Sequence, residues 1–165
     1  MNKYQQSLNQ IIKEAVVHLN TIDEDNFAKR PFADKWSKKE ILGHLIDSAY
    51  NNHQRFVRAK NRPNLIFEGY DQVAWVKRNA YQDRSASDII ICWQVVNNHL
   101  ANMIGHLSEE VLNRKLSTHN FHQIGMRPIE ATDAVSIAYM IEDYLFHTEH
   151  HLAQIIENYR WLSER

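Results

Sequence analysis

Apolar residues recur with the spacing of an α-helix along most of this 165-residue chain. The first such series shares one helical face and consists of Leu8, Ile11, Ile12, Ala15, Val16, Leu19 and Ile22. Strict alternation of apolar and polar residues, which a half-buried strand would show, is almost absent. The chain also has four glycines and three prolines, so few residues interrupt a helix. These patterns predict an all-α fold.

Capping signals give the starts of the later helices. Ser37 followed by Glu40 forms a capping box, in which each side chain accepts a hydrogen bond from the other residue's backbone N–H. Ser85 or Ser87 can cap a third long helix, and Thr132 can cap the last one. The expected long helices lie at about residues 3–20, 38–61, 85–107 and 132–162, with short helices at 70–78 and 109–114.

The length and composition fit one domain over residues 1–165. A chain of this size with 44% hydrophobic residues can bury one substantial core. Four long amphipathic helices of this kind pack as a bundle. We therefore predict a four-helix bundle with one or two short additional helices.

Charge and cysteine content exclude several classes of protein. The net charge of −1 provides no basic field for nucleic acid. No apolar run is long enough to span a membrane, and the N-terminus lacks the apolar core of a signal peptide. The lone Cys92 excludes an internal disulfide, and its apolar neighbours predict a buried thiol. We expect a cytoplasmic protein that binds neither nucleic acid nor membrane.

Two histidines four residues apart predict a metal clamp in the last helix. His147 and His151 lie one helical turn apart, so both rings can reach one ion. They border the apolar face, where unpartnered imidazoles would cost free energy. A hydrogen-bond network with Asp143, Gln154 or water would satisfy them equally well. The pair therefore leaves two interpretations open, a metal site and a polar network.

A metal site needs a third ligand, and His44 is the best candidate in the chain. Its direction on the second helix lies away from the apolar stripe of Ile41 and Leu45. It can act as a ligand only if this polar sector faces a cleft shared with the last helix. The sequence has neither the His-Glu-x-x-His motif of zinc proteases nor the Gly-x-Ser-x-Gly motif of serine hydrolases.

A series of short motifs resembles the DinB-like superfamily, in particular its YfiT-like branch of metal-dependent enzymes. The motifs are Trp36-Ser37, the segment Ile41 to Ser48, Asn52 with Arg55-Phe56, the segment Tyr70 to Trp75, and the segment His147 to Ile155. The resemblance implies a four-helix bundle in which His44, His147 and His151 hold one divalent transition metal, zinc or nickel. It also implies use of a low-molecular-weight thiol as co-substrate, and a homodimer.

The expected chemistry is Lewis-acid activation by the metal. A cation held by three neutral imidazoles lowers the pKa of a bound water or thiol. We predict a metal-dependent thiol transferase or hydrolase acting on a small electrophile. Gln154 and Glu149 are expected to support the ligand histidines. The substrate cleft is expected to involve Asp47, Asn51, Arg55, Tyr70, Asp71 and Trp75, although a surface or packing role explains each of these equally well.

A second hypothesis comes from a different class of protein. The chain would then be a non-catalytic helical bundle whose metal, or histidine network, is structural or binds a ligand or partner. Turnover separates the two hypotheses, because a binding module would bind metal without converting thiols and electrophiles.

Overall fold

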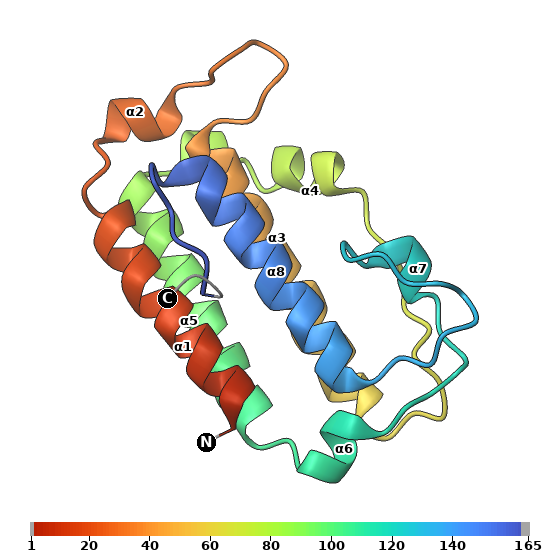
Figure 1. Cartoon of the computed structure of the whole chain (residues 1–165). Coiled ribbons are helices and arrows are strands. Elements are labelled where there is room, and N and C mark those ends of the chain that lie inside the picture. Colours follow the sequence, from red (N-terminus) through yellow and green to blue (C-terminus); the bar gives the residue numbers. More distant parts are fainter. Residues whose placement is uncertain (1, 163–165) are drawn as a thin grey trace.

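The computed structural model describes residues 2–162, which form a bundle of four long helices (Figure 1). The long helices are α1 (Lys3–Leu19), α3 (Lys38–Ala59), α5 (Ala86–Gly105) and α8 (Ile137–Ile155). The short helices are α2 (Glu24–Ala28), α4 (Gln72–Arg78), the 3-10 helix η1 (Tyr81–Asp83), α6 (Glu109–Asn113) and α7 (Phe121–Ile124). The predicted all-α bundle is confirmed, and α2, η1 and α7 are additional to the two short helices expected.

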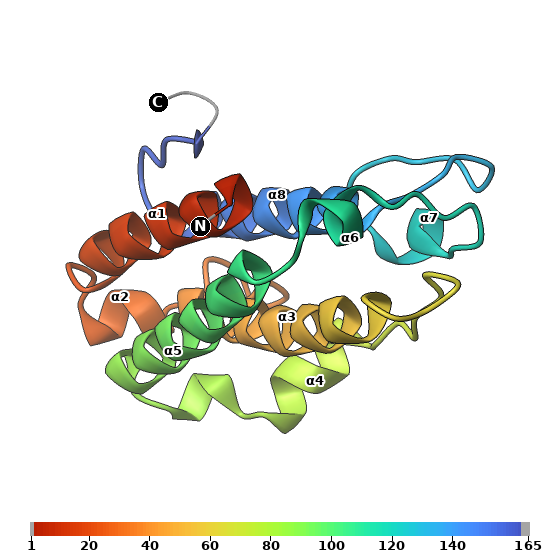
Figure 2. The same ribbon diagram turned by 90° about the horizontal axis from the view of Figure 1, so that it is seen from below.

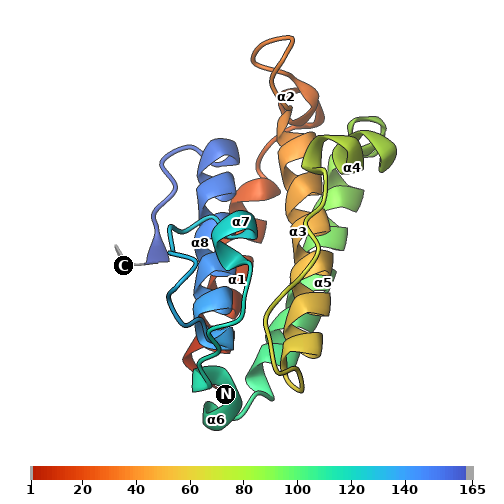
Figure 3. The same cartoon turned by 90° about the vertical axis from the view of Figure 1, so that its right-hand side faces the viewer.

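The four long helices follow an up-down-down-up order. Both α1 and α3 pack against α5 and α8. Helices α1 and α8 run in one direction and α3 and α5 in the other, as Figures 1 and 3 show. The chain must therefore return along the bundle between the parallel helices α3 and α5, and residues 60–85, with α4, make this crossing (Figure 2). As a result, the first half of α3 lies beside the second half of antiparallel α8.

The predicted helix starts are correct except for the last. The Ser37 capping box is present, with Glu40 N–H donating to Ser37 Oγ at 3.2 Å and Ser37 N–H to a Glu40 carboxylate oxygen at 2.9 Å. Helix α8 begins after Ser136 instead of Thr132, because Ser136 Oγ accepts from the N–H of Tyr139 at 3.2 Å. It also ends at Ile155 instead of near residue 162, since the backbone is extended at Ile156.

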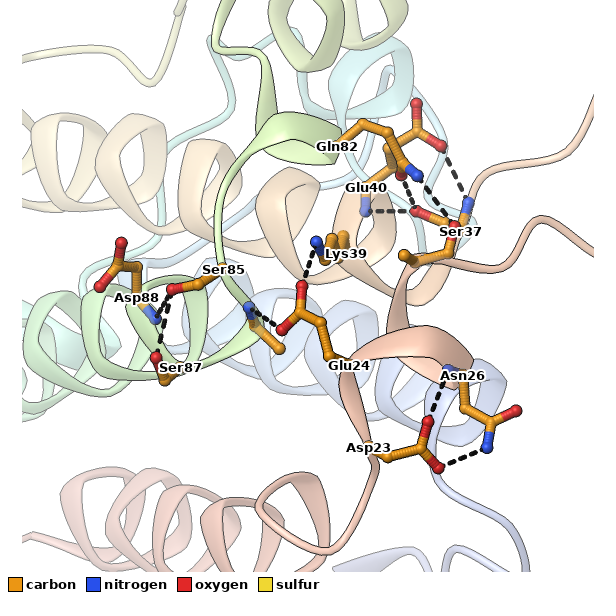
Figure 4. A network of polar contacts seen from close by, with 12 residues as sticks. Asp23, Glu24, Asn26, Ser37, Lys39, Glu40, Gln82, Ser85, Ser87 and Asp88 are labelled. Carbon is orange, nitrogen blue, oxygen red and sulfur yellow. Dashed lines mark hydrogen bonds and ion pairs between the residues drawn. The ribbon is translucent and has the colours of Figure 1, made fainter.

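A polar network joins the starts of α2, α3 and α5 (Figure 4). Glu24 accepts a hydrogen bond from the N–H of Ala86 at 2.9 Å and forms an ion pair with Lys39. Ser37 Oγ donates to the Gln82 side chain at 2.6 Å. These contacts hold one end of α3 against both neighbouring segments. They fix the position of the helix half that carries His44.

The core fills the space between the four long helices. Its largest fully buried side chains are Trp93, Tyr144, Phe27, Phe56 and Phe121. The prediction of a buried Cys92 is wrong, because its side chain is half-buried. The adjacent Trp93 points into the core, so Cys92, about 100° around the helix, lies at the edge. Among the described residues, no helix is sufficiently long and apolar to cross a lipid bilayer.

Candidate metal centre

The three predicted histidines meet between α3 and α8. His44 Nε2 lies 3.0 Å from His147 Nε2, although the two residues are 103 positions apart in sequence. One nitrogen from each of His44, His147 and His151 lies within 4.8 Å of the other two. His44 is fully buried, so the polar sector of α3 does face the last helix. His44 could act as a third ligand only if its side of α3 faced the last helix, and it does so.

The imidazole rings meet at steep angles. The His44 ring is 5.1 Å from that of His147 and 4.8 Å from that of His151, with interplanar angles of 70° and 76°. The two rings of the α8 clamp are 4.6 Å apart at 70°. The indole of Trp36 also packs against the His44 ring, with ring centroids 5.4 Å apart. The rings therefore approach through their edges, where the nitrogens are, instead of stacking.

Burial keeps the three imidazoles neutral. It lowers the pKa of His44 to about 4, and the nearby His151 contributes in the same direction. Burial also lowers the pKa of His147 well below 6.5, with a further contribution from the neighbouring histidines. The pKa of His151 is lowered by burial, although its hydrogen bond to Gln154 opposes the shift. Neutral imidazole is the form that binds a metal.

Neighbouring side chains orient two of the rings. The His151 Nδ1–H donates to Gln154 Oε1 at 3.2 Å, which leaves the lone pair on Nε2. The same Gln154 donates through Nε2 to His150 at 3.0 Å, so its amide orientation is fixed from both sides. His147 Nδ1 lies 3.4 Å from Ser48 Oγ, which leaves Nε2 facing His44. Gln154, which was predicted to support the ligand histidines, therefore contacts the ring of His151.

The donor set fits a transition-metal ion. Two nitrogens bound to a tetrahedral zinc ion lie about 3.3 Å from each other, given bonds of about 2.0–2.1 Å. The separation of 3.0 Å between His44 Nε2 and His147 Nε2 is close to this value. Three neutral imidazoles are ligands that zinc and nickel both accept, and they leave coordination positions free.

Two buried polar atoms beside the histidines have no hydrogen-bond partner among the described residues. They are His44 Nδ1 and Asp47 Oδ2, which belong to residues three positions apart on α3. The other Asp47 oxygen accepts from Tyr81 Oη at 2.7 Å and from Asn79 Nδ2 at 2.8 Å. Burial raises the pKa of the Asp47 carboxyl, and these two hydrogen bonds oppose the shift. Asp47, one turn after His44 on α3, is thus held by η1 and the end of α4.

A cavity of about 390 Å³ opens onto His147 and His151. Two of the predicted cleft residues, Arg55 and Tyr70, line it. The sequence analysis did not identify the rest of its wall, which includes Ser48, Asn52, Gly69, Gln72, Asp143, Tyr144 and residues 123–126. These residues come from four separate segments, and only the packing of α3, α8 and the loops beside them brings the segments to one wall.

Asp143 does not form the histidine network that the sequence left open. Its carboxylate accepts from the N–H groups of Met126 at 3.0 Å and Arg127 at 2.6 Å. Burial raises the pKa of this carboxyl, and the two backbone donors oppose the shift. Asp143 therefore fixes the segment after α7 against α8, where that segment forms one wall of the cavity.

A second cavity of about 560 Å³ adjoins the first. Asn51 and Trp75 line it, and Arg55 lines both cavities. Asp71 instead caps α4, accepting from the N–H of Ala74 at 3.0 Å. Glu149 accepts hydrogen bonds from Tyr159 Oη at 3.2 Å and from the N–H of Leu162 at 2.7 Å, so it holds the segment after α8.

Comparisons with known proteins identify a family and a shared fold. The sequence model of the DinB superfamily matches residues 7–155. OB0413 of Oceanobacillus iheyensis, whose name records an inferred metal-dependent hydrolase activity, is 23% identical over 83% of this chain and 72% of its own length. YfiT of Bacillus subtilis, similarly named, is 20% identical over 90% of this chain and 80% of its own.

The fold has a solved counterpart. The structure of Bacillus subtilis YfiT, a four-helix bundle of unusual topology, superimposes with a TM-score of 0.73 at 16% identity. The alignment covers 93% of this chain and 82% of that structure. The order and packing of the helices are therefore shared over nearly the whole described chain.

Proposed function

This chain belongs to the DinB superfamily, and from that membership we propose that it is a metal-dependent enzyme acting on a small molecule. The observation that carries the proposal is the convergence of three neutral imidazoles, two of which, His147 and His151, line a cavity. His44, His147 and His151 would hold one zinc or nickel ion. A bound ion of this kind acts as a Lewis acid and lowers the pKa of a bound water or thiol.

The cavity wall supports a role for a nucleophile that is not part of the protein. No cysteine is among the lining residues, since Cys92 lies on α5 and away from both cavities. The nucleophile would then enter as a bound molecule, either a low-molecular-weight thiol or water. We propose transfer of a thiol to a small electrophile as the reaction, with hydrolysis as the second candidate, which the names of the two relatives favour.

Two side chains on the cavity walls, the buried Arg55 and the half-buried Tyr70, would shape the substrate position. Burial raises the pKa of Tyr70 to about 12, so its hydroxyl stays protonated and can donate a hydrogen bond into the cavity. The Tyr70 ring packs on Trp75 at 5.0 Å and forms part of the wall between the two cavities. Arg55 contributes a positive charge to the same wall.

Metal content is the first test of this proposal. We expect elemental mass spectrometry to find about one transition-metal ion per chain, since three histidines form a single site. The ion should be lost in each of the variants His44→Ala, His147→Ala and His151→Ala. His18→Ala, at an exposed position on α1, is the matched control and should retain it. A wild-type chain that takes up neither zinc nor nickel would contradict the metalloenzyme proposal.

Turnover then separates an enzyme from a binding module. A panel of thiols with electrophiles, and of esters and amides, is assayed on the metal-loaded protein. We expect activity that chelation and His151→Ala both abolish. Product containing the thiol indicates transfer, and product formed without a thiol indicates hydrolysis. Metal binding without turnover of any substrate would favour the non-catalytic bundle instead.

A further inference from the structure

Arg55 is a buried cation that forms no ion pair within residues 2–162, and the carboxylate of Asp143 on the same cavity wall attracts it only from beyond ion-pair distance. It is 8% exposed, and no ion pair of the described chain includes it. Its Nη2 donates to the backbone carbonyl of Glu68 at 3.2 Å, which is a neutral acceptor. Burying a charge without a counter-ion is costly, and an arginine retains its proton even so. Asp143, whose carboxylate is held by the N–H groups of Met126 and Arg127, offsets part of this cost from a distance, and an anion from outside the chain would supply a direct partner.

The position of Arg55 makes its guanidinium accessible to a ligand. Arg55 lies on the wall of both the 390 Å³ cavity at the histidines and the adjoining 560 Å³ cavity. Each cavity is within the size range of small-molecule sites. A ligand bound through Arg55 could therefore extend from there to His147 and His151.

Two further arginines line the outer cavity. Arg58 follows Arg55 by three residues and so lies on the same side of α3, and Arg62 lies just beyond the end of this helix on the wall of the same cavity. Arg62 Nη1 donates to the backbone carbonyl of Ile66 at 3.3 Å, and Arg58 is exposed without an ion pair within residues 2–162. Glu68 is the single acidic residue of this lining, which leaves a net positive wall.

Aromatic side chains complete the outer cavity. Trp75, Phe67 and Tyr50 line it together with the three arginines. The guanidinium of Arg62 lies 5.9 Å from the centre of the Phe67 ring, a distance at which a cation is attracted to the ring face. The cavity therefore combines cationic donors with flat apolar surfaces. This combination suits an oxyanion carried on an apolar or aromatic body.

We propose that Arg55, Arg58 and Arg62 form an anion subsite that binds a carboxylate or phosphate group of the substrate. Guanidinium groups bind both anions through paired hydrogen bonds. The inference rests on the proposed function, because it places the reacting end of the same molecule at the histidines. It narrows the substrate class to small organic anions with an apolar body.

The test measures binding and does not depend on turnover. Isothermal titration calorimetry is carried out with benzoate, phenyl phosphate and the neutral benzamide, first on the protein as purified and then after chelation. Chelated protein excludes an anion bound to the metal. We expect benzoate or phenyl phosphate to bind in both states, and benzamide to bind at least about 10-fold more weakly, since a hydrogen bond to a charged group is involved. The anion that binds with the higher affinity shows whether the subsite prefers a carboxylate or a phosphate group.

Variants locate the site on α3. Arg58→Gln should weaken anion binding by about 2- to 5-fold, as expected for an exposed charge. Arg55→Lys should weaken it by more than about 10-fold, because lysine keeps the charge and loses the paired donors. Arg78→Gln on α4 removes an exposed charge outside both cavities and is the matched control, with no change expected.

The results of this anion-binding test can be distinguished from a failure of the metalloenzyme proposal. Anion binding that persists in a chain without metal supports the subsite even if the metalloenzyme proposal fails. Equal affinity for benzoate, phenyl phosphate and benzamide would overturn the subsite, as would absence of anion binding at the highest soluble concentration. Equal effects of Arg58→Gln and Arg78→Gln would overturn it as well, since they would reflect overall charge.

Discussion

The ring of Tyr81 packs directly against the backbone of Gly43, at a position where any Cβ atom would overlap the ring. Gly43 immediately precedes His44, and the hydroxyl of Tyr81 donates to Asp47 at 2.7 Å on the next turn of the same helix. This close approach connects η1 to the half of α3 that carries the metal-site candidate. It explains a glycine in the middle of a long helix, where glycine costs about 1 kcal/mol relative to alanine.

Replacing this glycine should destabilise the fold. Gly43→Ala gains helix propensity but forces the Tyr81 ring away, and we expect a net loss of about 1–2 kcal/mol in the free energy of unfolding. Chemical denaturation measures this loss. Gly69→Ala is the matched control, because its Cβ would lie 3.8 Å from Ile124, an ordinary contact. Unchanged stability of Gly43→Ala would show that the Tyr81 ring can move at no cost.

Gln154 should determine metal affinity without being a ligand. It accepts from Nδ1–H of His151 at 3.2 Å and so directs the Nε2 lone pair toward the other histidines. We expect Gln154→Ala to weaken zinc binding by about 10- to 100-fold, the usual effect of removing a group that orients a ligand. Competition with a chromogenic chelator measures the affinity. Gln6→Ala, exposed on α1, should bind zinc like the wild type, and equal affinities in all three proteins would argue against this role.

Metal should stabilise the folded chain. An ion bound to the folded state and not to the unfolded state raises the melting temperature, and saturation at about 100 times the Kd adds about 2.7 kcal/mol. We expect zinc or nickel to raise the melting temperature of the wild type and to leave that of His44→Ala unchanged. Each protein is compared with itself after chelation, so the cavity left by the substitution does not enter the comparison. An equal rise in both proteins would place the ion elsewhere.

A second histidine pair should make stability depend on pH. The ring of His53 lies 4.9 Å from that of His99, and burial, followed by the charge of His99, lowers the pKa of His53 below 6.5. The unfolded chain then binds the proton more readily than the folded chain, so stability falls as the pH drops below about 6.5 and is regained as it rises.

Comparing variants isolates this contribution from those of the other histidines. We expect His53→Gln to lose less stability than the wild type between pH 7.5 and pH 5.5, since it removes one group with a lowered pKa. Denaturation of chelated protein at the two pH values gives the difference. His18→Gln, on the exposed side of α1, is the control. An identical loss in the wild type and in His53→Gln would contradict the prediction.

The ends of helices were predicted correctly where the capping residues are close to each other in the sequence. The capping box of Ser37 and Glu40 involves residues three apart, so the start of α3 was correctly predicted. The start of α8 was missed because the polar loop before it offers both Thr132 and Ser136 as caps. Which of them acts depends on how residues 114–136 pack, and Leu116 pairs with Val135 immediately before Ser136.

The burial of His44 could not be predicted from the spacing of apolar residues along α3. A single apolar stripe predicts one buried face, yet every residue from 39 to 49 of α3 is buried. Helices α5 and α8 pack against α3, and α4 and η1 contact it as well, so polar residues of this half are buried with the apolar ones. The sequence showed which residue types could bind a metal. Its periodicity could not show that they were inside the fold.

The sequence by itself determined the all-α class, the four long helices and the pair of histidines one turn apart in α8, because these depend on contacts within a few residues. Only the tertiary structure decided that His44 meets this pair, since the antiparallel packing of α3 and α8 brings together residues 103 positions apart. It likewise decided that residues 123–126 form a cavity wall and that Arg55 is buried without an ion pair in the described chain. Both are consequences of long-range packing, which no local pattern encodes.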